Sequence, residues 1–150
     1  MKEVTIYTDG ACSGNPGIGG WAAILIYKGV EKVLSGSCPD TTNNRMEMFA
    51  IIYALKALKE KCKVHIYSDS AYIINAMNNK WIDKWKTTNW KTASKEDVKN
   101  IDLWQDLIMY SSKHDIIWHK VKGHSDNEYN NRCDELARAE IKKLSELTNS

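Results

Sequence analysis

The chain has 150 residues, of which 43% are hydrophobic and 27% are charged, and its formal net charge is +2. A chain of this length can bury about two-thirds of its unfolded surface, so a single domain over residues 1–150 needs no disulfide framework. The composition excludes a disordered chain, and no apolar run is long enough to span a bilayer.

The cysteines and the N-terminus indicate the compartment. Cys12, Cys38, Cys62 and Cys133 are spaced singly, without a C-x-x-C pair, and Met1 leads into a strand pattern without an apolar leader. Both features predict reduced thiols in a cytoplasmic protein that is neither secreted nor membrane-bound. We expect a monomer, since no segment suggests an obligate protein partner.

The first part of the chain predicts three strands. Lys2–Thr8 alternates apolar and polar residues, which is typical of a strand. The glycine-rich segment Asp9–Gly20 predicts a turn or loop. Trp21–Tyr27 and Val30–Gly36 then predict two strands joined at Lys28-Gly29, which indicates an antiparallel hairpin.

The remainder alternates helices and strands. In chain order it predicts a helix capped by Asn43-Asn44 and reaching about Lys61, a strand over Val64–Ser68, a helix over Ser70–Asn79, an unusual block over Lys80–Lys99, a helix over Ile101–Ser111, a strand over Ile116–Val121, a loop over Lys122–Asn127 and a last helix to about Leu144. This order predicts an α/β fold with a mixed five-stranded sheet. An antiparallel hairpin edge joins parallel strands, and helices cover both faces.

Two nearly identical hexapeptides stand far apart in the chain. IYTDGA spans Ile6–Ala11 and IYSDSA spans Ile66–Ala71, and each places an aspartate after an apolar strand run. In α/β sheets, functional groups gather beyond the carboxyl ends of the parallel strands. We therefore expect Asp9 and Asp69 to be neighbours in space.

Two further acids lie in register with the apolar faces of helices. Ala50 and Leu55 belong to a stripe that begins at Glu47, and Asp134 is in register with Ala137 on the last helix. Both acids should therefore point toward the sheet.

Four converging carboxylates would repel one another unless a cation offsets their charge. Oxygen-only ligands suit Mg²⁺ or Mn²⁺, and four carboxylates can hold two ions about 3.5–4 Å apart. Each acid also has a local explanation: a turn at Asp9-Gly10, a helix cap at Asp69, a helix-dipole partner at Glu47, and an ion pair of Asp134 with Arg138.

Four segments, DGACSGNPGIGGW, TTNNRMEM, YSDSAY and VKGHSDNEYNNRCDELAR, closely resemble the signatures of type 1 (bacterial-like) ribonuclease H, in the same order over almost the whole chain. The resemblance implies a ribonuclease H-like fold and a single catalytic domain. It also implies endonucleolytic hydrolysis of the RNA strand of RNA–DNA hybrids, leaving 3′-hydroxyl and 5′-phosphate ends. The implied metal-binding carboxylates are Asp9, Glu47, Asp69 and Asp134, with two Mg²⁺ ions that Mn²⁺ could replace.

His124 lies in a predicted loop just before the last helix. It is either an exposed residue without a role or, beside the carboxylates, a group that moves protons near neutral pH. The resemblance implies that it assists departure of the leaving group or product and does not bind metal, so its loss should weaken activity without abolishing it.

Asparagines near the predicted site have two readings. Asn15, Asn43 and Asn44 are either turn and cap residues or amides that reach sugar hydroxyls and base edges in a wide minor groove. The resemblance favours substrate contact and places Thr42 near a backbone phosphate. Ala71 departs from the glutamine of many bacterial members, which leaves one polar contact open.

The block Lys80–Lys99 interleaves tryptophans with lysines. It is either a helical excursion with solvated lysines or a basic, aromatic-lined ridge that grips phosphates. The block resembles the protrusion with which the family holds the DNA strand, while Trp104, beyond it, is predicted to be core. The residues implied to contact substrate here are Trp81, Lys84, Trp85, Lys86, Trp90 and Lys91.

Two rival functions remain. A DNA-directed nuclease or strand transferase of the same fold would also use clustered acids, but the asparagines and TTNNRME argue against it. A non-catalytic hybrid-binding module predicts a lost carboxylate, and none of the four is missing.

Overall fold

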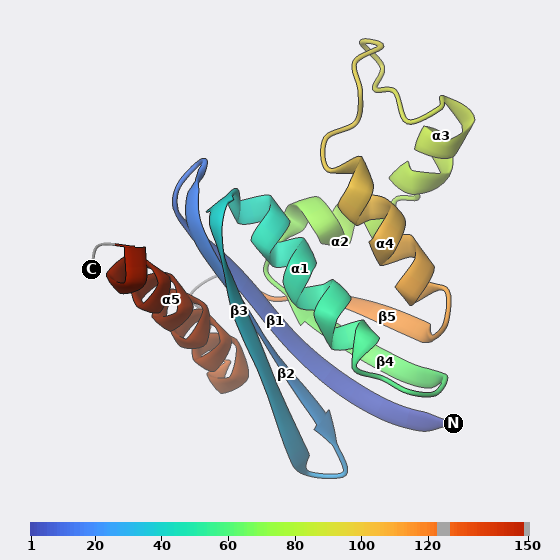
Figure 1. Cartoon of the computed structure of the whole chain (residues 1–150). Helices are drawn as coiled ribbons and strands as arrows, with labels where there is room; N and C mark the ends of the chain where they lie inside the picture. Colours follow the sequence, from blue (N-terminus) through green and yellow to red (C-terminus); the bar gives the residue numbers. More distant parts are fainter. Residues whose placement is uncertain (123–126, 149–150) are drawn as a thin grey trace.

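The computed structural model describes residues 1–122 and 127–148 and has an α/β fold around one five-stranded sheet (Figure 1). The elements are β1 (Lys2–Gly14), β2 (Gly17–Tyr27), β3 (Val30–Thr41), α1 (Asn43–Lys56), β4 (Cys62–Ser68), α2 (Ala71–Asn78), α3 (Trp81–Thr87), α4 (Ile101–Ser111), β5 (Asp115–Lys120) and α5 (Glu128–Thr148).

The strand order β3-β2-β1-β4-β5 confirms the predicted mixed sheet. β1 pairs antiparallel with β2 and parallel with β4, and β4 pairs parallel with β5. The hairpin of β2 and β3 closes at Lys28 and Gly29, whose φ angles of 49° and 79° lie in the left-handed region that tight hairpin turns require.

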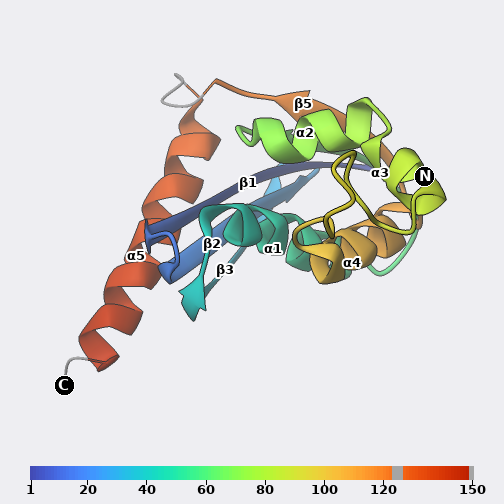
Figure 2. The same cartoon turned by 90° about the horizontal axis from the view of Figure 1, so that it is seen from above.

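Helices cover both faces of the sheet. One apolar cluster joins β1 and β4 to α1, α2 and α4, and it contains Trp104, which is fully buried as predicted. A smaller cluster joins β2 to α5 on the opposite face, and Figure 2 shows α5 set apart from the other four helices. None of the described helices is both long enough and apolar enough to cross a membrane.

The loop predicted for Asp9–Gly20 is wrong, because β1 continues to Gly14 and pairs with β2 from Gly17 onward. The antiparallel ladder satisfies the backbone groups of this stretch, so only the hairpin tip is a turn. Asp9 therefore lies within a strand and not at its end.

Two of these glycines let helices approach the sheet closely. A Cβ at Gly10 would lie 2.4 Å from the backbone nitrogen of Glu47, and a Cβ at Gly20 would lie 2.2 Å from the backbone oxygen of Ala137. Gly10 thus allows α1 to pack closely against one face of the sheet, and Gly20 allows α5 to pack closely against the other.

The helix boundaries also differ from the prediction. α1 is capped by Thr42, whose hydroxyl accepts a hydrogen bond from the Arg45 backbone nitrogen at 3.3 Å, so Asn43 and Asn44 lie in the first turn. The helix ends at Lys56 and not near Lys61, because the chain turns there to enter β4.

The tryptophan and lysine block forms a protrusion that carries α3 and the loop after it (Figure 1). Five residues between Lys80 and Asn100 have φ angles in the left-handed region, which turns the chain repeatedly without regular structure. The protrusion returns to the body of the molecule at the start of α4.

We predict that Gly10→Ala destabilises the fold by about 1–3 kcal/mol, because the added methyl group meets backbone atoms of α1 that cannot yield without moving the helix. The melting temperature should fall by about 2–4 °C for each kcal/mol. Gly29→Asn is the matched control, since no atom of the described part of the chain lies within 4 Å of that Cβ position and asparagine tolerates its φ of 79°. Equal losses in both variants would contradict the role given to Gly10.

Candidate active site

Three of the four predicted acids meet beside β1. Ligand atoms of Asp9, Glu47 and Asp69 all lie within 4.8 Å of one another. The parallel register pairs Tyr7 with Tyr67 and then stops, so the two aspartates follow side by side. The expectation that the two hexapeptides are neighbours is confirmed.

The acids arrive from opposite faces of the sheet. Asp9 pairs with Ala22, on the face covered by α5, whereas Glu47 belongs to α1 on the other face. Their side chains can meet because β4 ends at Ser68, which leaves the flank of β1 free at the level of Asp9.

Burial dominates the electrostatics of this cluster. Asp9 and Glu47 are 7% and 3% exposed. Desolvation, more than the charge of Asp69, raises the pKa of Asp9 to about 7, although hydrogen bonds from Glu47 and the Gly10 backbone nitrogen oppose the rise. Desolvation and the charge of Asp9 raise the pKa of Glu47 well above its usual range. Without a cation, the cluster holds protons near neutral pH.

The donor set fits a hard divalent cation. The ligand atoms are all carboxylate oxygens, which suit Mg²⁺ or Mn²⁺ better than zinc. Glu47 Oε2 is buried and has no hydrogen-bond partner among the described residues, and a bound cation would satisfy it. The cluster could therefore hold a metal ion.

Asp134 lies on the same cavity, which has a volume of about 400 Å³, but outside the close group of three acids. Its carboxylate is 3.2 Å from Arg138 Nε one turn along α5, which is the ion pair considered as its local alternative. The cavity is lined by Asp9, Gly10, Ala11, Asn43, Asn44, Glu47, Asp69, Ser70, Ala71, Tyr72, Asp134 and Arg138.

Only two of the three asparagines predicted to contact substrate lie on this cavity. Asn43 and Asn44 line the cavity in the first turn of α1. Asn15 is exposed at the tip of the β1–β2 hairpin and does not line it. His124 lies outside the described residues.

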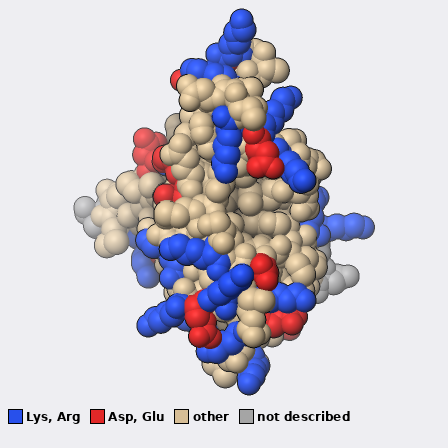
Figure 3. All heavy atoms as spheres, turned by 90° about the vertical axis from the view of Figure 1, so that its right-hand side faces the viewer, with Lys and Arg blue, Asp and Glu red and all other residues tan. Residues whose placement is uncertain are grey.

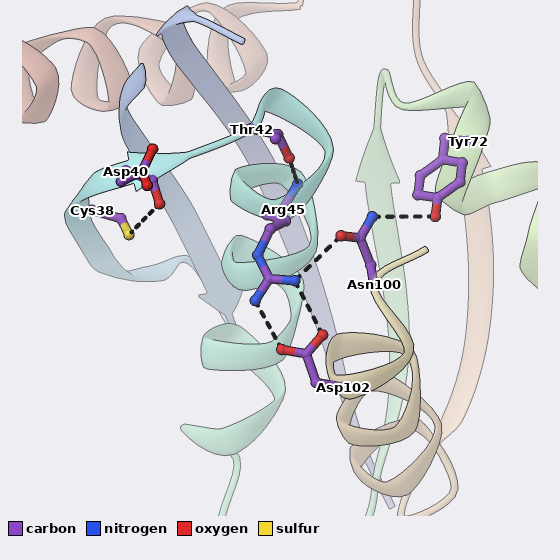
Figure 4. A network of polar contacts seen from close by, with 7 residues as sticks. All are labelled: Cys38, Asp40, Thr42, Arg45, Tyr72, Asn100 and Asp102. Atoms are coloured by element: carbon purple, nitrogen blue, oxygen red, sulfur yellow. Dashed lines mark hydrogen bonds and ion pairs between the residues drawn. The ribbon is translucent and has the colours of Figure 1, made fainter. Parts of the chain in front are cut away.

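A polar network that the sequence analysis missed fixes the cavity wall (Figure 4). Arg45 Nη1 and Nη2 donate to the Asp102 carboxylate at 3.1 and 2.8 Å, and Nη1 also donates to Asn100 Oδ1 at 3.2 Å. Asn100 Nδ2 and Trp104 Nε1 donate to the hydroxyl of Tyr72 at 3.4 and 3.0 Å. The first turn of α1, the first turn of α2 and the start of α4 are thereby tied together. Arg45 stands three residues after the capping Thr42 in the sequence, but no sequence pattern indicates that its side chain contacts α4.

The predicted substrate ridge divides into two sides. A groove of about 250 Å³ is lined by Trp81, Lys84, Trp85 and Lys91, with Lys91 paired to Asp97. Trp85 packs among three other tryptophans with the ring planes tilted, and its ring centroid lies 6.3 Å from that of Trp81, 6.2 Å from that of Trp90 and 5.5 Å from that of Trp104.

Lys86 does not share this groove, because it lines a separate hollow beside Trp118. Lys and Arg side chains project from the upper end of the molecule in Figure 3, which is formed by α3 and the loop after it, with a few acids among them. The protrusion therefore presents both positive charge and aromatic surface.

Comparison with known proteins places the chain in a family. The RNase H family model matches residues 1–142. This chain belongs to the RNase H family. Ribonuclease H of Acetivibrio thermocellus is 65% identical, covering 97% of this chain and 99% of its own length, and that of Caldicellulosiruptor saccharolyticus is 64% identical, covering 96% and 99%. The enzyme class of the chain is accordingly ribonuclease H.

Solved structures agree with the RNase H fold. LC9-RNase H1, a type 1 RNase H with the type 2 active-site motif, is 29% identical with a TM-score of 0.85, covering 95% of this chain and 73% of that one. LC11-RNase H1, solved in complex with RNA/DNA hybrid, is 22% identical with a TM-score of 0.69, covering 94% and 98%. At 22% identity, the similarity to LC11-RNase H1 concerns the fold alone.

We predict that metal-free Asp9→Asn is more stable than the wild type at about pH 8. The pKa of Asp9 is about 7 in the folded chain, against an ordinary value of 3.8 that applies to the unfolded chain. The folded chain therefore binds this proton more tightly, and the stability that the proton contributes is complete below about pH 4 and is lost as the pH rises through 7. Removing the charge should raise the melting temperature by about 3–8 °C at pH 8.

Calorimetry at about pH 4 and pH 8 would test this, and the difference should shrink at the lower pH. Millimolar Mg²⁺ should raise the melting temperature of the wild type more than that of the variant. Identical wild-type and variant curves at both pH values would mean that Asp9 carries no uncompensated charge.

Proposed function

We propose that the chain cleaves the RNA strand of RNA–DNA hybrids endonucleolytically, leaving 3′-hydroxyl and 5′-phosphate ends. The observation that carries the proposal is the close group of Asp9, Glu47 and Asp69, in which Asp9 and Glu47 are buried and one Glu47 oxygen has no partner among residues 1–122 and 127–148. Raised pKa values for Asp9 and Glu47 are what a site built for a cation has when no cation offsets the charge.

Asp9, Glu47 and Asp69 would hold metal, and Asp134, on the rim of the cavity, would complete the set of four carboxylates. Two Mg²⁺ ions bound there would activate a water and offset charge on the attacking and leaving oxygens of an in-line displacement. Asp134, which is paired with Arg138 in this structure, would give up that ion pair when it holds metal.

The remaining residues position the hybrid. Asn43 and Asn44 present amides at the cavity, where they can bond to sugar hydroxyls and base edges of an A-like minor groove. Thr42, at the cap of α1, and Asn15, at the hairpin tip outside the cavity, would add further contacts to the substrate. The 2′-hydroxyl group, which DNA lacks, is the feature such amides can use to select the RNA strand.

The DNA strand would lie along the groove of the protrusion. Trp81 and Trp85 supply flat apolar surface, and Lys84 and Lys91 supply charge for phosphates. His124 would move a proton to the leaving 3′ oxygen or help the product depart. A hybrid therefore bridges the protrusion and the cavity.

The deciding experiment is a cleavage assay on end-labelled RNA–DNA hybrid with Mg²⁺, in parallel with single-stranded RNA, duplex RNA and duplex DNA. We expect cutting of RNA in the hybrid alone. Asp9→Asn should lose at least about a hundredfold in rate, since removing one transition-state partner commonly costs that much. Cutting of duplex DNA would favour the DNA-directed alternative, and hybrid binding without cutting in Mg²⁺ or Mn²⁺ would favour a binding module.

A matched pair of lysines tests the position of the DNA strand. Lys84→Ala should raise KM for the hybrid by about fivefold with kcat little changed, and should lower the slope of log affinity against log salt by about 1. Lys86→Ala removes the same charge from the other side of α3, so its KM should stay within about twofold of wild type. The opposite ranking would place the DNA strand on the Lys86 side.

A further inference from the structure

A second polar cluster crosses the sheet away from the carboxylate cavity. It consists of Glu3 on β1, His65 on β4 and His119 on β5. The three lie on the same face of the sheet, because odd-numbered residues of β1 pair with odd-numbered residues of β4, and these pair with odd-numbered residues of β5. None of the three lines the carboxylate cavity. α5 packs across β1, β2 and β3 of this face, and Ile117, in register with His65, is 40% exposed.

The three side chains are joined in a line. His65 Nε2 is 2.9 Å from Glu3 Oε1, and His65 Nδ1 is 3.0 Å from His119 Nε2. The imidazole rings are stacked with centroids 5.2 Å apart, and Tyr67 stacks on His119 at 4.4 Å. Both histidines are half-buried, so packing holds their rings in place.

The carboxylate fixes the tautomer of His65. An ionised Glu3 can only accept, so His65 Nε2 carries a hydrogen, and in the neutral imidazole Nδ1 is then the nitrogen with the lone pair. In this tautomer Nδ1 accepts the hydrogen of His119 Nε2, which lies 3.0 Å away. Burial, and then the positive charge that His65 carries when it is protonated, lowers the pKa of His119, which favours its neutral imidazole.

We propose that His65 Nδ1 and His119 Nε2 form a binding site for a borderline divalent transition metal such as Zn²⁺, with Glu3 as the outer carboxylate. Two nitrogens bound tetrahedrally at 2.0–2.1 Å from zinc are about 3.3 Å apart, close to the 3.0 Å observed. His119 binds by moving its hydrogen from Nε2 to Nδ1, so no net proton is lost, and water fills the other positions.

The arrangement matches how proteins orient a metal-binding histidine, in which the second ring nitrogen donates to a carboxylate. Imidazole ligands select zinc, copper or nickel over Mg²⁺, whereas the carboxylate cavity has only oxygen ligands. A cation here would join β4 to the edge strand β5.

Equilibrium dialysis of the untagged chain against Zn²⁺, with excess Mg²⁺ to occupy the carboxylate site, tests the proposal. We expect one zinc per chain, lost in His65→Gln and in His119→Gln. Glu3→Gln should weaken binding by about 10–100-fold, because the outer carboxylate orients the ligand. Circular dichroism of each variant without metal checks that it is folded.

Two control variants distinguish this site from other side chains that could bind zinc. Asp69→Asn, in the carboxylate cavity, and His124→Gln should both keep the bound zinc. With Cu²⁺ in place of zinc, electron paramagnetic resonance should detect coupling to two imidazole nitrogens in the wild type. Zinc that remains in folded His65→Gln, or that disappears in Asp69→Asn, would overturn the proposal.

Discussion

The close approach of α1 to β1 at Gly10 is the constraint on which the site depends. Because no side chain stands at that position, the backbone of Glu47 lies directly against the strand that carries Asp9. A free flank beside β1, where pairing with β4 stops after Tyr7, lets the carboxylates meet from both faces. Gly20 likewise lets α5 approach the sheet closely, and α5 carries Asp134 to the rim of the cavity.

The same packing makes the carboxylates costly. Asp9 and Glu47 are almost completely buried, and burial is the main reason that their pKa values rise. A fold optimised for stability alone would not place ionisable groups there, and a bound cation would offset their charge. Arg138 offsets one charge, at Asp134, where the site is most open to solvent.

The protrusion and the cavity are mechanically connected. Arg45, in the same turn as Asn43 and Asn44, bonds to Asn100 and Asp102 where the protrusion returns to the body (Figure 4). Tyr72, on the cavity wall, accepts from Asn100 and Trp104. These hydrogen bonds tie the wall of the cavity to the base of the protrusion.

Sequence patterns by themselves determined the α/β fold class with its mixed sheet, the family and the candidate acids, because hydrophobic periodicity and short motifs are local properties of the chain. They misjudged Asp9–Gly20, since glycines that admit helices look the same as glycines that form turns. Only the tertiary structure separated Lys84 from Lys86 and joined Glu3, His65 and His119. These relations depend on which side of a helix a residue faces and on the register between strands distant in sequence, which no local pattern encodes.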